Sequence, residues 1–219
     1  MESRAPQIVG VILSRIDFQR AIRMRNPPDL FELRLDGLAR SIKAVREGID
    51  KLPAPCIITA RHPREGSANQ LSSGERCELL LTFLPRAAYV DIELRSARPL
   101  APVLRAARTK NIRVIISFHD FRGTPTALRL DKIARAAQSL SPDVVKIATR
   151  TDTPAQFERL LGFFERQPGG KVVAMGIGKL GRKSRLELAR RGCPLNYAHL
   201  GAPQIAGQLS IPELRQALR

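Results

Sequence analysis

Eight short apolar segments alternate with amphipathic segments along this chain, and this alternation limits its fold more than any other feature. Several apolar segments are rich in Val and Ile, as strands buried on both faces of a parallel sheet are. Eight alternations of strand and helix predict an α/β fold, a single compact (β/α)8 TIM barrel in which residues 1–219 form one catalytic domain. The predicted strands lie at residues 7–13, 30–37, 56–61, 89–94, 113–121, 143–150, 171–178 and 195–201.

The segments between these strands carry apolar residues at helical spacing. The clearest one begins with Asp152 or Thr153 as N-cap and Pro154 in its first turn, and it ends at the Pro-Gly-Gly of residues 168–170. A doubly wound open sheet is the alternative fold, but no GxGxxG motif follows the first strand. The glycines of 176–185 follow the seventh strand, where barrels often bind anions. Helices are predicted over 98–111, 129–142, 151–170 and 184–192.

The chain is strongly basic, with a formal net charge of +17 over 219 residues. Such a charge attracts anionic substrates, nucleic acid or anionic membranes. However, the basic residues are dispersed and Trp is absent, so neither a groove-following stripe nor a base-stacking platform is evident. We expect a small anionic substrate and no nucleic-acid partner. A basic barrel that binds nucleic acid is kept as an alternative, which steeply salt-dependent binding would reveal.

Cysteine usage and hydropathy predict the compartment. The three cysteines are widely spaced and form no CxxC pair, which argues against a disulfide framework and a zinc site and fits a reducing compartment. No apolar run reaches 18 residues, and the apolar stretch at 8–13 is too short for a signal peptide. We therefore expect a cytoplasmic protein without a membrane partner or a metal.

Charged residues occupy every second position of several predicted strands. Because side chains alternate between the two faces of a strand, these residues share one face. In a barrel this face points inward, since the other face packs on the helices. We expect Asp91 and Glu93 to belong to a structural ion network that fills the barrel. The inward set comprises Glu32, Arg34, Asp36, Arg61, Asp91, Glu93 and Lys146.

Lys146 lies within the apolar segment DVVKIATR, where an unpaired ammonium is costly to desolvate. A structural lysine in this place needs a dedicated carboxylate. A lysine among cations is instead favoured as the neutral amine, which is a nucleophile. Arg34 and Arg61 are the candidate cations, so we expect Lys146 to form a Schiff base with a ketone.

His119 stands at the carboxyl end of the fifth predicted strand, where the catalytic residues of barrels lie. Next to an inward lysine, a histidine here is a candidate general acid and base. Glu65, in RHPREGS after the third strand, could orient its imidazole and balance its charge. The residues alone leave the substrate open.

Six motifs in this order and spacing resemble type I 3-dehydroquinate dehydratase, from about Gln7 to the C-terminus. The motifs are FELRLDG, ITARHPREGS, DIEL, SFHDFRGTPT, VVKIAT and MGIGKLGRKSR. The resemblance implies a (β/α)8 lyase of the shikimate pathway that converts 3-dehydroquinate to 3-dehydroshikimate without a metal or diffusible cofactor. It also implies a homodimer.

The resemblance implies a role for each matching residue. Lys146 would form the imine with the C3 ketone, His119 would move the protons, and Glu65 would partner His119. Arg185 would pair with the substrate carboxylate, as a planar bidentate guanidinium can. The other implied substrate-binding residues are Glu32, Arg34, Arg61 and Gln208.

The closing loop departs from the family pattern Ser-Ala-Pro-Gly-Gln. Gln204, Ile205 and Ala206 replace the first three residues, and Gly207-Gln208 is retained. We expect a less rigid loop with altered substrate contacts. A class I aldolase-type barrel is kept as a further alternative, because such enzymes also use a sixth-strand lysine and often bind phosphorylated substrates after strands seven and eight.

Overall fold

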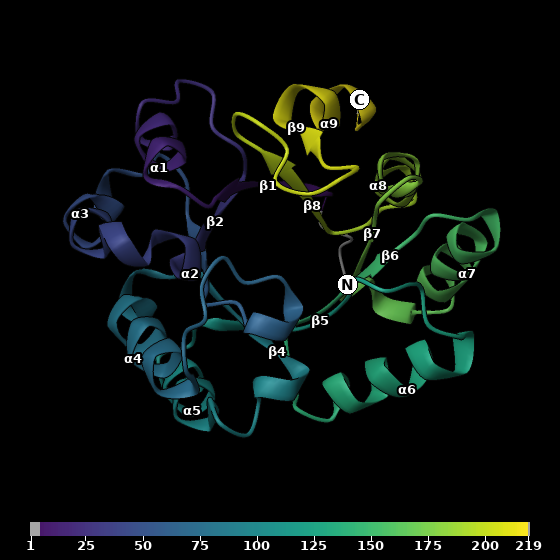
Figure 1. Cartoon of the computed structure of the whole chain (residues 1–219), viewed down its shortest axis with the longest axis horizontal. Helices are drawn as coiled ribbons and strands as arrows, with labels where there is room; N and C mark the ends of the chain where they lie inside the picture. Colours follow the sequence, from purple (N-terminus) through teal and green to yellow (C-terminus); the bar gives the residue numbers. More distant parts are fainter. Residues whose placement is uncertain (1–4, 219) are drawn as a thin grey trace.

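The computed structural model describes residues 5–218, in which nine strands form one parallel sheet that curls into a ring (Figure 1). The strand order is β7-β6-β5-β4-β3-β2-β1-β8-β9. The predicted α/β barrel class and all eight predicted strands are confirmed. The strands are β1 (Gln7–Ile12), β2 (Leu30–Arg34), β3 (Cys56–Thr59), β4 (Tyr89–Glu93), β5 (Arg113–Asp120), β6 (Val144–Arg150), β7 (Val172–Ile177), β8 (Leu195–His199) and β9 (Leu209–Ser210).

The ninth strand, β9, was not predicted. It has two residues and pairs with β8 after the chain has passed through the 200–208 loop. That residues 1–219 form one domain stays a prediction, and residues 1–4 and 219 of that range lie outside the described part.

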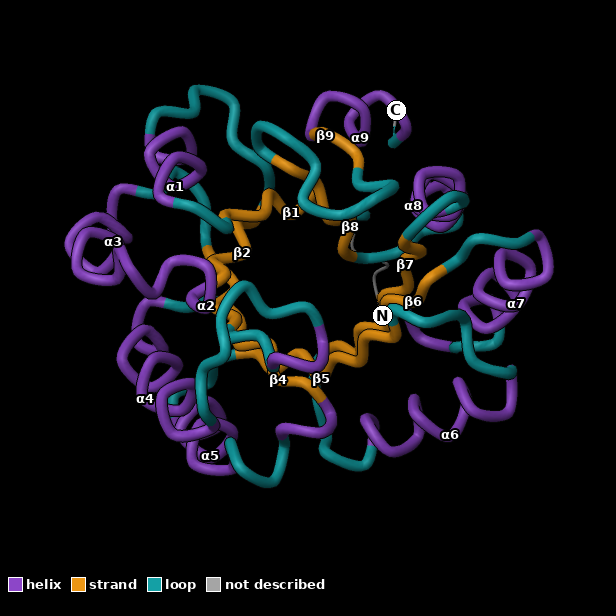
Figure 2. The backbone as a smooth tube through the Cα atoms, in the orientation of Figure 1, coloured by secondary structure: helices purple, strands orange, loops and turns teal. Residues whose placement is uncertain are grey.

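The helices surround the ring of strands on its outside (Figure 2). None of the helices in residues 5–218 is long and apolar enough to cross a membrane. The helices are α1 (Arg15–Ile22), α2 (Leu35–Leu38), α3 (Ile42–Gly48), α4 (Ser73–Phe83), α5 (Ala101–Thr109), α6 (Ala127–Gln138), α7 (Pro154–Glu165), α8 (Gly181–Arg190) and α9 (Ile211–Ala217).

Helix ends follow local capping chemistry. Thr153 caps α7, because its side chain accepts a hydrogen bond from the Gln156 amide, and Pro154 occupies the first turn as predicted. The predicted span of 151–170 was too long at its end, because α7 stops at Glu165 and the Pro-Gly-Gly segment forms a separate 3-10 turn. Helix α8 starts three residues earlier than predicted, at Gly181, directly after the loop from β7.

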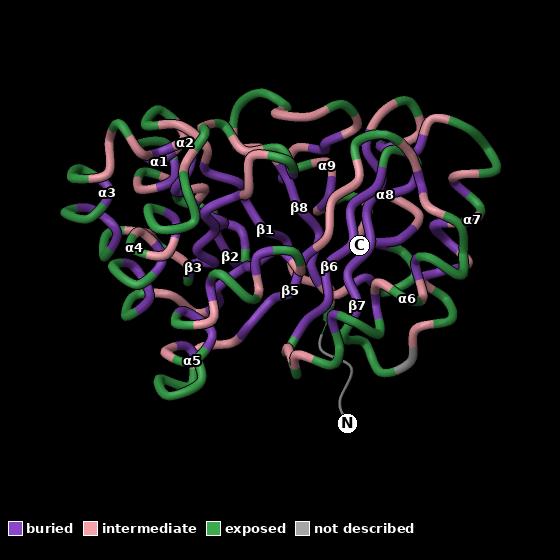
Figure 3. The backbone as a smooth tube through the Cα atoms, turned by 60° about the horizontal axis from the view of Figure 1, so that its bottom comes forward, coloured by how far each residue is buried: buried purple, intermediate pink, exposed green. Residues whose placement is uncertain are grey.

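Alternation along the strands sorts side chains into two layers. Leu33, Ile92 and Ile147 are fully buried in the apolar layer between the sheet and the helices. The intervening Glu32 and Lys146 point into the ring, as the period-two pattern predicted. The strands accordingly lie in the buried centre of the molecule, and exposed residues gather on the helices and loops around it (Figure 3).

The ring has a seam between β7 and β8. No ladder joins these two strands within residues 5–218. Side chains instead reach the backbone carbonyls that border the seam. Arg185 of α8 donates from Nε to the Gly176 oxygen (3.0 Å) and from Nη1 to the Tyr197 oxygen (3.3 Å). Cys193 Sγ lies 3.7 Å from the Ala174 oxygen. Side chains therefore bridge the seam, and one of them, Arg185, also lines the cavity described below.

The layer outside the sheet should carry much of the stability. We expect Ile147→Ala to lower the free energy of unfolding by about 2–5 kcal/mol, because it leaves a cavity in a fully buried site. Leu128→Ala on α6 is the control, since Leu128 is 63% exposed and its loss should change the value by no more than about 0.5 kcal/mol. Urea unfolding measures both. Equal effects of the two variants would contradict this assignment of the core.

Candidate active site

A cavity of about 400 Å³ opens at the carboxyl ends of the strands. This is the end of a TIM barrel at which active sites are built, because the loops that follow the strands converge there. All eight site residues predicted from the sequence line it, and Lys146 is the one lysine among the described lining residues. They are Glu32, Arg34, Arg61, Glu65, His119, Lys146, Arg185 and Gln208.

Lys146 is 2% exposed, and its Nζ lies between two carboxylates. Nζ is 2.5 Å from Asp91 Oδ2 and 3.2 Å from Glu32 Oε1. The ring of Tyr197 lies beneath it, with its centroid 4.3 Å from Nζ. The expectation that cations surround this lysine is therefore wrong for its direct contacts. In the described structure the amino group of Lys146 is held between two carboxyl groups.

Arg34, one of the two predicted cations, is paired with Asp36 and not with the groups around Lys146. Arg34 donates from Nε and Nη2 to the two oxygens of Asp36, at 3.0 and 2.8 Å. Asp36 lies in α2, just beyond the end of β2, and also accepts from the amides of Arg61 and Ala68. These contacts hold the pKa of Asp36 below its usual value against the opposing effect of burial. Arg34 also donates to the Gly66 oxygen (2.9 Å), so the pair ties β2 to the loop after β3.

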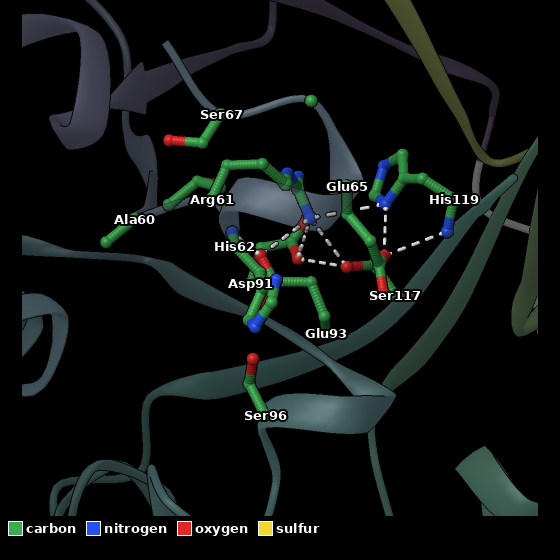
Figure 4. Close-up of polar contacts among 12 residues, drawn as sticks. Ala60, Arg61, His62, Glu65, Ser67, Asp91, Glu93, Ser96, Ser117 and His119 are labelled. Atoms are coloured by element: carbon green, nitrogen blue, oxygen red, sulfur yellow. Dashed lines mark hydrogen bonds and ion pairs between the residues drawn. The ribbon is translucent and has the colours of Figure 1, made fainter. Parts of the chain in front are cut away.

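Arg61 is the centre of the ion network that was expected for Asp91 and Glu93 (Figure 4). Its guanidinium is 2% exposed and contacts Asp91 at 3.1 Å, Glu93 at 3.3 Å and the Ser117 hydroxyl at 2.8 Å. Burial alone would raise the pKa of Asp91, but Arg61 and Lys146 outweigh it and hold this pKa far below its ordinary value. Asp91 therefore remains an anion beside Lys146.

Arg76 completes the network and was missed by the sequence reasoning. From α4 it donates to Glu93 (2.5 Å), to the Ala60 oxygen (2.7 Å) and to the Ser96 hydroxyl (3.1 Å), with 1% of its side chain exposed. The detectable signal was its spacing, because Arg76 falls on the same helical face as Leu80 and Phe83. A charge on the buried face of an amphipathic helix requires a buried partner.

His119 and Glu65 form the hydrogen-bonded pair predicted between them. Glu65 Oε2 lies 3.0 Å from His119 Nδ1 and accepts the His119 backbone N–H at 2.9 Å (Figure 4). Burial, with the charges of Arg61 and Lys146, lowers the pKa of His119 well below its ordinary value, so its imidazole is neutral. Burial, together with the carboxylate of Glu93, raises the pKa of Glu65 to about 7.

Glu65 reaches this position through a short 3-10 turn, Pro63–Glu65. The turn is fixed at its start, because the His62 amide donates to Glu93 Oε1 at 2.8 Å. On the far side, Arg95 Nε lies 2.9 Å from Glu65 Oε1. Arg95 was also missed by the sequence reasoning, because it lies one residue beyond the predicted strand 89–94, in the 3-10 turn Leu94–Ser96.

Arg185 differs from the other buried arginines. It is 7% exposed, and its two hydrogen bonds go to the backbone carbonyls of the seam. Burial without a compensating anion lowers its pKa to about 10. A guanidinium that is buried without a paired anion and lines a cavity is a suitable partner for the carboxylate of a ligand.

The 204–208 loop covers the cavity and is held by backbone contacts. The Ala206 oxygen accepts from the Gly178 amide (3.0 Å), and Gln208 Oε1 accepts from the Gln204 amide (2.8 Å). Gly207 has φ +86°, and a Cβ there would meet the backbone of Gly181 at 2.7 Å, so this position requires glycine. Gln204, Ile205 and Gln208 all line the cavity.

The described side chains that line the cavity can bind a small anion and react with a ketone, and they are not arranged to bind a metal ion. No group of three or more His, Cys, Asp or Glu residues in the described chain is arranged to bind a metal ion. Arg185 offers a site for a carboxylate, Lys146 offers a nitrogen that can act as a nucleophile, and the neutral imidazole of His119 offers a proton acceptor. This combination fits imine and proton-transfer chemistry on a small anionic ketone.

This chain is similar to known enzymes along nearly its whole length. A family model described as Type I 3-dehydroquinase matches residues 7–219. The 3-dehydroquinate dehydratase of Thermococcus gammatolerans is 37% identical over 216 residues, covering 96% of this chain and 97% of that protein. The enzyme of the same name from Methanothermobacter thermautotrophicus is 34% identical over 195 residues, covering 87% and 84%.

A solved structure shares the fold. Type I 3-dehydroquinate dehydratase from Clostridium difficile superposes with a TM-score of 0.83 at 24% identity, covering 98% of this chain and 91% of that one. The family model and the identities above together cover nearly all of the sequence. The chain therefore belongs to the type I 3-dehydroquinase family.

Proposed function

We propose that this chain removes water from 3-dehydroquinate to give 3-dehydroshikimate, a step of the shikimate pathway, through an imine on Lys146. One observation carries the proposal. A buried lysine and an imidazole paired with a carboxylate line the same cavity, in a chain of this family. The aldolase and nucleic-acid alternatives have no comparable support in the site.

The first step joins Lys146 to the substrate. Lys146 must attack as the neutral amine, so the ammonium first gives up a proton, and this proton and a second one from the same nitrogen pass to the carbonyl oxygen. The amine attacks the C3 carbonyl, and the carbonyl oxygen leaves as water. The resulting iminium keeps the positive charge near Asp91, so the same carboxylate that held the ammonium stabilises the intermediate.

The second step uses His119. Its neutral imidazole takes the C2 proton, and the electron pair of that C–H bond moves toward the iminium nitrogen to form an enamine. The enamine then expels the C1 hydroxyl, which takes the proton back from His119 and leaves as water. Hydrolysis of the new iminium releases the product and Lys146, so the net change is the loss of one water.

The remaining cavity residues bind the substrate. Arg185 is proposed to take the carboxylate because it is buried without an anion. Arg34, Arg61, Glu32 and Gln208 are proposed to position the hydroxyl groups. The predicted homodimer, the cytoplasmic location and the absence of a nucleic-acid partner stay predictions.

The imine is tested by borohydride trapping. Incubation with 3-dehydroquinate and borohydride should add the reduced substrate to the peptide that carries Lys146, as seen by mass spectrometry after digestion. Lys146→Ala should give no adduct and no turnover, whereas Lys132→Ala, at an exposed position of α6, should behave as the wild type. An adduct formed with sugar phosphates and not with 3-dehydroquinate would support the aldolase alternative. An adduct on another lysine would overturn the assignment of Lys146.

Replacement of His119 should affect turnover but not the formation of the imine. His119→Ala should lower kcat by about 10²–10⁴-fold, the usual contribution of a general acid and base, while the borohydride adduct still forms. Stopped-flow kinetics and trapping on the same sample give both readouts. Near-normal turnover in this variant would show that another group moves the proton.

The pH dependence of kcat should follow the protonation of the Glu65 carboxylate. Ionised Glu65 accepts a hydrogen bond from Nδ1–H of His119 and leaves Nε2 free to take a proton. Because its pKa is raised to about 7, kcat should fall as the pH drops through about 7 and Glu65 becomes protonated. Glu65→Gln should lower kcat by about 10²–10⁴-fold and remove this limb. A profile that stays flat through this range in the wild type would contradict the assignment.

A further inference from the structure

The carboxylate of Glu65 is shared between two partners on opposite sides. Oε2 faces His119 in the cavity, and Oε1 faces Arg95 at 2.9 Å. The Glu65 side chain is 1% exposed, whereas that of Arg95 is 42% exposed. A buried general-base partner is thus connected to the outside of the barrel by one ion pair. The catalytic scheme proposed above does not use Arg95.

We propose that Arg95 is a positioning residue that keeps Glu65 ionised and its carboxylate turned toward His119. The inference rests on the proposed function, because it concerns the proton that His119 moves. Arg95 does not reach the cavity itself and acts only through Glu65.

The surroundings of Glu65 explain why it needs this cation. Burial favours the protonated acid, and so does the neighbouring anion Glu93 of β4. Arg61 opposes them and lowers the pKa of Glu65 more than Arg95 does, although the hydrogen bonds of its guanidinium go to Asp91, Glu93 and Ser117. From β5, His119 contributes its backbone N–H.

Among these groups, Arg95 is the cation that contacts the Glu65 carboxylate directly. Its removal should therefore favour the protonated acid. A protonated Glu65 would donate to Nδ1 and leave the proton on Nε2, which is the wrong tautomer for a base.

The position of Arg95 is itself fixed by the buried network. Arg95 lies in the 3-10 turn Leu94–Ser96, directly after Glu93. Ser96 of that turn accepts a hydrogen bond from Arg76 at 3.1 Å. The turn is therefore anchored at Glu93 and Ser96, and Arg95 between them extends back to Glu65. An ordinary exposed ion pair contributes little because both partners are solvated, but here the anion is buried.

A neighbouring arginine offers a matched control. Arg98 is exposed and lines the same surface groove as Arg95, a hollow of about 480 Å³ beside α5. Replacing Arg98 removes the same charge from the same groove. A long-range effect of net charge would therefore appear in both variants, whereas an effect through Glu65 would appear only when Arg95 is replaced.

The first test is the pH profile of kcat for Arg95→Gln, Arg95→Lys and Arg98→Gln. Arg95→Gln should move the acidic limb up by about one pH unit and leave kcat well above that limb within about twofold of the wild type. Arg95→Lys should restore most of the shift, and Arg98→Gln should superimpose on the wild type. Equal profiles for Arg95→Gln and wild type, or an equal shift in Arg98→Gln, would overturn the proposal.

The second test needs no turnover, so it separates this inference from the proposed function. The chain has three histidines, so ¹⁵N-histidine spectra can follow the His119 ring in the free protein. In the wild type the Nδ1–H tautomer should persist down to about pH 7, and in Arg95→Gln it should be lost at higher pH. If wild type fails to dehydrate 3-dehydroquinate but the tautomer shifts as expected, only the proposed function fails. An unchanged tautomer in Arg95→Gln would overturn the role of Arg95.

Discussion

The guanidinium of Arg61, buried at the centre of the barrel, determines where the other charges of the site can lie. A charge removed from water must be paired and hydrogen-bonded, or it becomes very costly. Arg61 satisfies Asp91 and Glu93 at once. Asp91 then holds Lys146, and Glu93 holds the amide of His62, which begins the turn that carries Glu65. The proposed nucleophile and the proposed acid–base pair are thus positioned by one network, closed at its far end by Arg76.

The seam between β7 and β8 places a different kind of charge in the same cavity. Arg61 and Arg76 are buried with carboxylate partners, whereas Arg185 is buried against backbone carbonyls. This contrast places Arg61 and Arg76 in the ion network and leaves Arg185 as the candidate partner for a ligand carboxylate. It also distinguishes one buried positive charge, that of Arg185, from the net charge of +17 that is dispersed over the chain. The proposed anionic substrate would meet Arg185, whose guanidinium has no carboxylate partner in the described structure.

Much of the site was predictable because period-two alternation and strand order are written in the sequence. The inward direction of Lys146 and Glu32 followed from alternation, and the position of His119 followed from its place at the end of a strand. The membership of Asp91 and Glu93 in an ion network was also predicted. The family motifs added Arg185 and Gln208, and both line the cavity. The lower rigidity expected for the closing loop stays a prediction, and no motif describes the contacts that Ala206 and Gln208 make in it.

The sequence by itself determined the eight strands, their parallel order and the face on which each polar side chain lies. Only the tertiary structure decided which charges meet. It placed Lys146 against carboxylates and not cations, brought Arg76 and Arg95 into the network from outside the strands, and set Arg185 across the seam. The physical reason is that alternation specifies a face but not a depth in the barrel or a neighbour across it. Those depend on the stagger of the strands and on the reach of long side chains from segments distant in sequence.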